Sequence, residues 1–134
     1  MDAGGHSHHP PVRVLLCDDT AEMRTLLRWA LEREDGVEIV AEAVDGRTAA
    51  RLAAEAAPEI VLLDLDMPGY GPEALLREVS AAAPGAAIVT FSGHEPDLVA
   101  GDAAGVVALH VPKTTDLPQV CLAVLELGRA RRGL

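Results

Sequence analysis

Short, almost continuous apolar runs alternate along the chain with longer segments in which apolar residues recur every three or four positions. Such runs are typical of strands buried on both faces, and the recurring spacing is typical of amphipathic helices. The runs predict strands at residues 12–17, 37–44, 60–63, 86–91 and 106–111. The recurring pattern predicts helices at residues 20–33, 47–57, 72–83, 97–104 and 116–131. Because strand and helix alternate, we expect an α/β fold, a five-stranded parallel sheet that is flanked by five helices and doubly wound.

One domain accounts for nearly all of the 134 residues, since a chain of this length has room for a single core. The hydrophobic fraction of 49% excludes intrinsic disorder for most of the chain. Residues 1–11 contain Gly, Pro and His without a repeating pattern. We therefore expect a flexible leader at 1–11 and one domain at 12–134.

The composition narrows the classes of partner. A net charge of −10 and an aromatic content of 2% disfavour direct nucleic-acid binding by this domain. No apolar run approaches the roughly 20 residues that a membrane-spanning helix needs, so we expect no membrane contact. The two cysteines, Cys17 and Cys121, lie far apart within apolar runs. Free buried thiols are typical of a reducing compartment, and we expect a cytoplasmic protein.

The carboxyl ends of the predicted strands carry most of the reactive side chains. In open parallel sheets, ligands bind beyond these ends. The residues found there are Asp18, Asp19, Asp64, Ser92 and Lys113, and the last is the only lysine of the chain. Neighbouring carboxylates resist ionising together unless a cation lies among them, and Mg²⁺ favours carboxylate and phosphate oxygens. A hydroxyl and an ammonium group at the same edge would suit the remaining oxygens of a phosphoryl group.

In this order, the strand-end residues resemble the receiver (CheY-like) domain of two-component response regulators. The resemblance covers nearly all of the chain after the leader. It includes an acidic pair after the first strand, the sequence Leu-Leu-Asp-Leu-Asp-Met-Pro-Gly at 62–69, and a later Ser92 and Lys113. The successive spacings from Asp19 to Asp64, to Ser92 and to Lys113 are 45, 28 and 21 residues.

The resemblance implies a phosphorylation site. Asp64 would accept a phosphoryl group from a sensor histidine kinase, a phosphotransfer protein or a small phosphodonor, forming an acyl phosphate. The resemblance also implies Mg²⁺ as the cofactor. Asp18, Asp19 and Asp64 would hold it together with the backbone carbonyl of Asp66.

Further roles follow from the resemblance for residues after the fourth strand and in the fifth. Lys113 would pair with one phosphoryl oxygen, and Ser92 would donate its hydroxyl to another. Ser92 and His110 would form the switch that relays phosphorylation to the surface. The family usually has Tyr or Phe where His110 stands, and a ring that titrates near neutrality would make such a switch sensitive to pH. Thr90 is a second hydroxyl nearby, but strand alternation places it inside the sheet, which favours Ser92.

As a member of this family the chain would be a signalling domain and not an enzyme, with self-catalysed phosphoryl transfer and dephosphorylation. Its surface made by the fourth helix, fifth strand and fifth helix would form a homodimer contact. No effector segment follows the last predicted helix. We therefore expect either a single-domain regulator or a receiver cut from a larger protein.

Two other interpretations remain. The sequence Asp64-Leu65-Asp66 after an apolar strand is similar to the nucleophile motif of haloacid dehalogenase-like aspartyl phosphotransferases. That motif normally follows the first strand and has Thr or Val where Pro68 stands here. The other interpretation is a degenerate receiver that acts as an interaction module without phosphorylation, and His110 at the switch position keeps it open.

Overall fold

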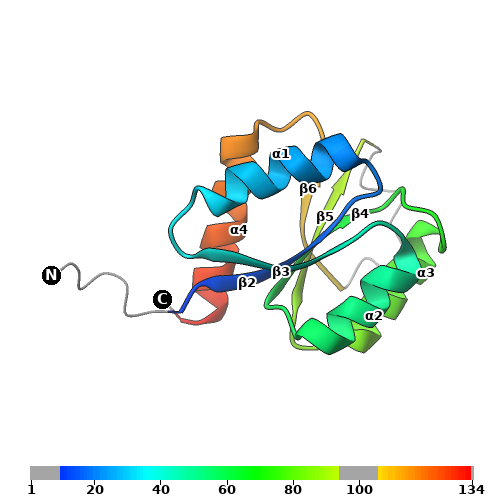
Figure 1. Ribbon diagram of the computed structural model, residues 1–134. Coiled ribbons are helices and arrows are strands. Elements are labelled where there is room, and N and C mark those ends of the chain that lie inside the picture. Colours follow the sequence, from blue (N-terminus) through cyan, green and yellow to red (C-terminus); the bar gives the residue numbers. More distant parts are fainter. Residues whose placement is uncertain (1–9, 94–105, 134) are drawn as a thin grey trace, which may run out of the picture.

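The computed structural model describes residues 10–93 and 106–133, and in these ranges strands and helices alternate along the chain (Figure 1). The strands are β2 (Val12–Cys17), β3 (Val37–Ala43), β4 (Ile60–Asp64), β5 (Ala87–Ser92) and β6 (Val107–Pro112). The helices are α1 (Ala21–Glu32), α2 (Gly46–Ala56), α3 (Pro72–Ala82) and α4 (Leu117–Arg131). All of them lie within two residues of the predicted boundaries. The helix predicted at 97–104 lies outside the described residues.

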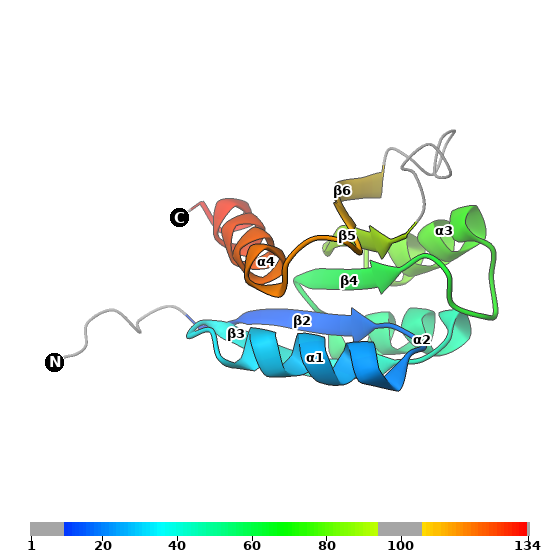
Figure 2. The ribbon, with the colours of Figure 1, turned by 90° about the horizontal axis from the view of Figure 1, so that it is seen from above.

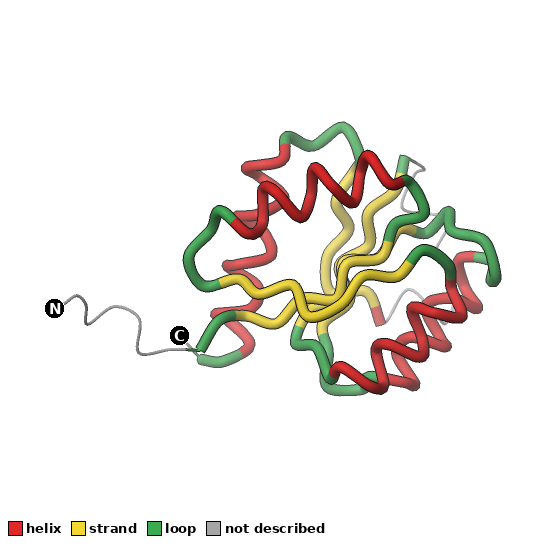
Figure 3. Tube along the Cα trace, in the orientation of Figure 1, coloured by secondary structure: helices red, strands yellow, loops and turns green. Residues whose placement is uncertain are grey.

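The five strands form one sheet in the order β3-β2-β4-β5-β6, and each pair of neighbours is parallel. Helices α1 and α4 cover one face of the sheet, and α2 and α3 cover the other (Figures 1 and 3). Figure 2 shows the sheet from above, with β2, β4, β5 and β6 following one another across it. The predicted doubly wound parallel sheet is confirmed. Within the described ranges, the helices are too short or too polar to cross a membrane.

Alternation along β2 explains why its apolar run is continuous. Val14 and Leu16 belong to the core on the α1 and α4 face, while Leu15 and Cys17 belong to the core on the α2 and α3 face. A strand covered on both sides buries every side chain, and each large one contributes about 1.5–3 kcal/mol. Two cores therefore hold β2 in place up to its last residue, where the acidic pair begins.

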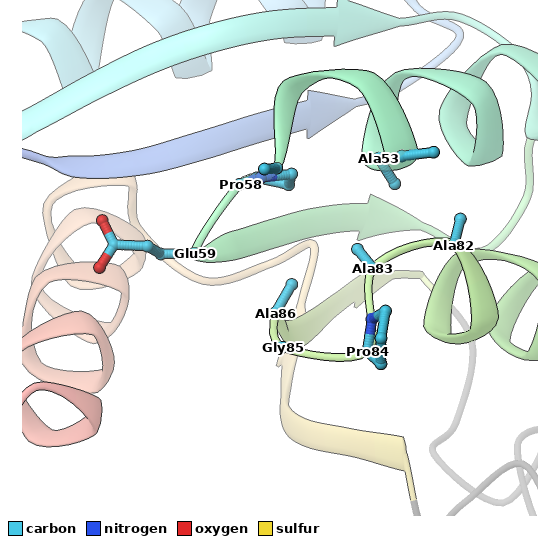
Figure 4. A pocket seen from close by; sticks show the side chains of 10 residues that line it. Ala53, Pro58, Glu59, Ala82, Ala83, Pro84, Gly85 and Ala86 are labelled. Atoms are coloured by element: carbon cyan, nitrogen blue, oxygen red, sulfur yellow. The ribbon is translucent and has the colours of Figure 1, made fainter.

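An apolar pocket of about 310 Å³ lies between the C-terminal ends of α2 and α3 (Figure 4). Its lining includes Ala53, Pro58, Ala83 and Ala86, which precede or flank the amino ends of β4 and β5. The charged side chain in its lining, Glu59, is held by the Arg132 guanidinium at 2.7 Å. The pocket is thus at the opposite end of the sheet from the strand-end residues singled out above.

Gly128 of α4 allows this helix to lie close to the start of β2. A Cβ atom at Gly128 would lie 2.7 Å from both methyl groups of Val12. We expect Gly128→Ala to lower the free energy of unfolding by about 1–2 kcal/mol, because the clash exceeds the gain in helix propensity. Guanidinium denaturation measures this change. Gly85→Ala is the control, since a Cβ there meets nothing within 4 Å, and equal stability of both variants would contradict the close approach of α4.

Candidate functional site

Two neighbouring parallel strands end at the same level and bring two carboxylates together. β2 pairs with β4 so that Cys17 lies opposite Leu63, and the next residues are Asp18 and Asp64. Both of these side chains are fully buried. Asp19 is exposed, yet one carboxylate oxygen from each of Asp18, Asp19 and Asp64 lies within 4.8 Å of the others. The sheet register thus produces an acidic cluster of three residues.

In each of the two buried carboxylates, one oxygen accepts a hydrogen bond and the other has no hydrogen-bond partner among the described residues. Oδ1 of Asp18 accepts the Thr20 N–H at 2.8 Å, and Oδ1 of Asp64 accepts the Asp66 N–H at 2.9 Å. Oδ2 of Asp18 and Oδ2 of Asp64 are buried and accept no hydrogen bond from the described residues. A buried acceptor without a partner costs about 1–3 kcal/mol. A hard divalent cation takes carboxylate oxygens as ligands, so this donor set fits one.

Lys113 supplies the ammonium group of the cluster. It follows β6, and its backbone N–H donates to the Ser92 carbonyl at 3.0 Å, which fixes its position at the sheet edge. Its Nζ lies 3.3 Å from Oδ1 of Asp64 and 3.7 Å from Oδ2 of Asp18. Burial alone would lower the pKa of Lys113, but the charges of Asp64 and Asp18 raise it above its usual value. The ammonium therefore stays charged.

Burial has the opposite consequence for Asp64. It raises the pKa of this carboxyl above the ordinary value, the Asp18 charge adds to the rise, and the Asp66 N–H and Lys113 oppose it. One ammonium faces three carboxylates in this cluster. The ionised site carries excess negative charge, which makes ionisation of Asp64 less favourable than that of an exposed carboxyl.

Ser92 and Asp66 lie together at this edge. Ser92 is the last residue of β5, is 1% exposed, and donates its hydroxyl to Oδ2 of Asp66 at 3.3 Å. Asp66 is exposed, and its negative charge also acts on Lys113. The structure therefore gathers the strand-end residues named from the sequence, with the Asp66 side chain beside them.

His110 makes a different contact. Its Nδ1 lies 2.7 Å from Oγ1 of Thr90, the residue opposite it in the β5 and β6 ladder, and its Nε2 is buried without a hydrogen-bond partner among the described residues. Thr90 is fully buried. The hydroxyl that rivals Ser92 in the sequence thus pairs with His110 and not with the acidic cluster.

Sequence reasoning missed Arg24. Its guanidinium donates to the Asp18 carbonyl at 2.9 Å, next to the carboxylates. A signal was available, because Arg24 lies near the start of α1, where the helix dipole disfavours a positive charge. An arginine at this position therefore suggests a specific contact that offsets the unfavourable interaction with the dipole.

Cys17 precedes the acidic pair but offers no nucleophile. Burial raises the pKa of its thiol far above the usual range, and the charges of Asp64 and Asp18 raise it further. A thiol that stays protonated reacts poorly, because the thiolate is the reactive form. Cys17 is therefore a core residue.

Comparison with known proteins agrees with the site. Residues 14–124 match the family model described as the response regulator receiver domain. A protein-glutamate methylesterase/protein-glutamine glutaminase of Myxococcus xanthus is 44% identical over 110 residues, which are 80% of this chain and 31% of that protein. The chain thus spans less than a third of the length of the curated relatives it matches.

Solved structures of response regulators have the same fold. The signal receiver domain of the putative response regulator NarL from Mycobacterium tuberculosis has a TM-score of 0.81 and 28% identity, covering 90% of this chain and 98% of that one. A two-component response regulator of the LuxR family from Aurantimonas has a TM-score of 0.79 and 31% identity, covering 90% and 87%. With this fold, this family match and an acidic cluster at the carboxyl ends of β2 and β4, the chain belongs to the response regulator receiver domains.

Proposed function

We propose that this receiver domain is switched by Mg²⁺-dependent phosphorylation of Asp64, with a sensor histidine kinase or a phosphotransfer protein as the donor. The observation that carries the proposal is the buried Asp64 carboxylate, which lies close to the Asp18 carboxylate and 3.3 Å from the Lys113 ammonium group. The family match supports a signalling role over an enzymatic one. It also disfavours the haloacid dehalogenase-like alternative.

The chemistry begins at Asp64. A carboxylate oxygen forms a bond to the phosphorus of phosphohistidine or of a small acyl phosphate. The bond from phosphorus to the donor atom breaks, and its electron pair leaves with the donor. Water later attacks the acyl phosphate, which releases inorganic phosphate and restores the carboxylate.

The acidic cluster would hold the cofactor. Asp18, Asp19 and Asp64 supply carboxylate oxygens, and the backbone carbonyl of Asp66 is the further ligand that the family resemblance suggests. When bound, Mg²⁺ neutralises charge that develops on the phosphoryl oxygens. The two buried oxygens without hydrogen-bond partners, on Asp18 and Asp64, support this assignment.

Lys113 and Ser92 stabilise the phosphorylated form in this proposal. The Lys113 ammonium stands within 3.3 Å of Asp64 and would pair with a phosphoryl oxygen. The Ser92 hydroxyl, which now donates to Asp66, would donate to another phosphoryl oxygen instead. Phosphorylation would thus exchange one partner of Ser92 for another, and this exchange is the start of the switch.

His110 is the second member of the proposed switch. It lies on β6 opposite Thr90, two residues before Ser92 on β5, so a shift of Ser92 reaches it through the strand pair. On β6 and α4, which belong to the surface predicted for a dimer contact, Leu109 is 37% exposed and Leu122 is 49% exposed. These apolar residues support the proposed homodimer contact through this surface.

The free thiols Cys17 and Cys121 support a cytoplasmic location.

Incubation with acetyl phosphate and Mg²⁺ should add one phosphoryl group, because Asp64 is the nearer of the two buried carboxylates to the Lys113 ammonium, at 3.3 Å against 3.7 Å for Asp18. Intact-mass spectrometry measures the addition. We expect Asp64→Asn or EDTA to abolish it, while Asp66→Asn, which keeps the backbone carbonyl, still accepts the group. A modification that survives Asp64→Asn would overturn the assignment, and repeated turnover of a phosphomonoester would favour a phosphatase.

Mg²⁺ should stabilise the folded protein, because the cation binds a cluster that the unfolded chain lacks. At about 100 times its dissociation constant, a ligand of the folded state adds about 2.7 kcal/mol to the free energy of unfolding. Urea denaturation with and without Mg²⁺ measures the gain. Asp19→Asn should reduce it, and Asp45→Asn, at the N-cap of α2, should not. A gain that is the same in all three proteins would place the cation elsewhere.

Removal of the Asp64 charge should stabilise the protein when divalent cations are absent. Burial raises the pKa of Asp64, so the folded state holds this proton more tightly than the unfolded chain does. Stability then falls as the pH rises from the ordinary carboxyl pKa, about 4, through the raised value. We expect Asp64→Asn to gain stability over the wild type across that window and to keep the gain at higher pH.

The measurement is chemical denaturation in EDTA at several pH values. Asp45 is the matched control, because hydrogen bonds from Thr48 lower its pKa. Its ionised form stabilises the folded state, and this contribution is lost as the pH falls through the lowered value. Asp45→Asn should therefore lose stability relative to the wild type above that value. An Asp64→Asn variant that behaves like Asp45→Asn would show that ionised Asp64 is favourable in the folded state.

A further inference from the structure

The turn that carries the acidic pair is held by three hydrogen bonds to Asp18. Its N–H donates to the Ala43 carbonyl at 3.0 Å, its Oδ1 accepts the Thr20 N–H at 2.8 Å, and its carbonyl accepts from Nη1 of Arg24 at 2.9 Å. The remaining carboxylate oxygen, Oδ2, is buried, lies 3.7 Å from Nζ of Lys113 and has no hydrogen-bond partner among the described residues. These bonds fix the direction in which Oδ2 of Asp18 points.

Of these three bonds, the one from Arg24 comes from a side chain of α1. The same guanidinium directs Nε toward Oε1 of Glu42 on β3, at 3.6 Å. β3 is the neighbour of β2, and Glu42 pairs with Leu16, two residues before Asp18. Arg24 therefore connects the acidic turn to α1 and to the adjacent strand. The planar guanidinium spreads its donors over three nitrogens, so Nη1 can bind the carbonyl while Nε faces the carboxylate, whereas an ammonium offers a single nitrogen.

Arg28 offers a natural comparison. Its Nη1 lies 2.8 Å from Oε2 of Glu42, a shorter ion pair than that of Arg24 with the same carboxylate. Its hydrogen bond within the described ranges goes to Glu42 and not to the acidic turn. The two arginines share a partner and a helix, and they differ in the contact with Asp18.

We propose that Arg24 is a positioning residue for the cation site. By holding the Asp18 carbonyl, it keeps the turn in the conformation that presents Oδ2 of Asp18 and the Asp19 carboxylate to the metal. The inference rests on the proposed Mg²⁺-dependent function. It assigns to Arg24 no contact with the metal or the phosphoryl group.

The test is the Mg²⁺ dissociation constant, followed through the amide chemical shifts of residues 18–20. Loss of a group that orients a metal ligand typically weakens affinity by about 10–100-fold. We expect Arg24→Gln to weaken Mg²⁺ binding by about 10-fold, and Arg28→Gln to stay within about twofold of the wild type. Arg24→Lys, which keeps the charge but has a single nitrogen in place of the guanidinium, should fall between them and serves if Arg24→Gln does not fold.

Stability in EDTA separates positioning from a general loss of structure. Both arginines make partly exposed ion pairs, so the denaturation midpoint of each Gln variant in EDTA should shift only slightly and by a similar amount. Equal Mg²⁺ affinity in Arg24→Gln and the wild type would overturn the inference, as would an equal loss in Arg28→Gln. A wild type that binds no Mg²⁺ and accepts no phosphoryl group would instead remove the proposed function itself, and the inference with it.

Discussion

Negative charge buried at the carboxyl ends of β2 and β4 is the constraint on which the rest of the site depends. The parallel register places Asp18 beside Asp64, and two hydrophobic cores keep both strands in place. Carboxylates this close and this deeply buried ionise against desolvation and against each other. The site therefore carries uncompensated negative charge that favours cation binding. Lys113 neutralises only part of this charge. In the proposed function, this partly neutralised cluster would bind a divalent cation and accept a phosphoryl group.

The charges of the site also explain the two hydrogen bonds of Ser92. Its hydroxyl donates to the Asp66 carboxylate, while its carbonyl accepts the Lys113 N–H. One residue at the end of β5 thus contacts both the ammonium side and the acidic side of the site. Any new negative group on Asp64 would compete with Asp66 for the Ser92 hydroxyl and for the charge of Lys113. In the proposed switch, coupling from the site into β5 and β6 would start from this competition, and His110 lies on the neighbouring strand.

The sequence predicts those features that depend on backbone order and fails where side-chain packing decides. Mainly apolar runs locate the strands to within one residue at most ends, since a strand buried on both faces carries few polar residues along its length. Strand ends then locate Asp18, Asp64, Ser92 and Lys113. The contact of Arg24 with Asp18 depends on a side-chain conformation across a turn, and the pairing of Thr90 with His110 depends on strand register. Neither leaves a periodic signal.

Net charge is a poor guide to this site, although it first suggests a cation. The chain has 21 acidic and 11 basic residues, and those on exposed helix faces are screened within about 8 Å at physiological ionic strength. Asp18 and Asp64 are fully buried, so solvent screens them far less. These two side chains among 21 therefore contribute most of the unscreened negative charge at the proposed cation site. The same reasoning supports a specific role for Lys113, the only lysine of the chain. All other basic residues are arginines, and this one compact ammonium lies against the two buried carboxylates.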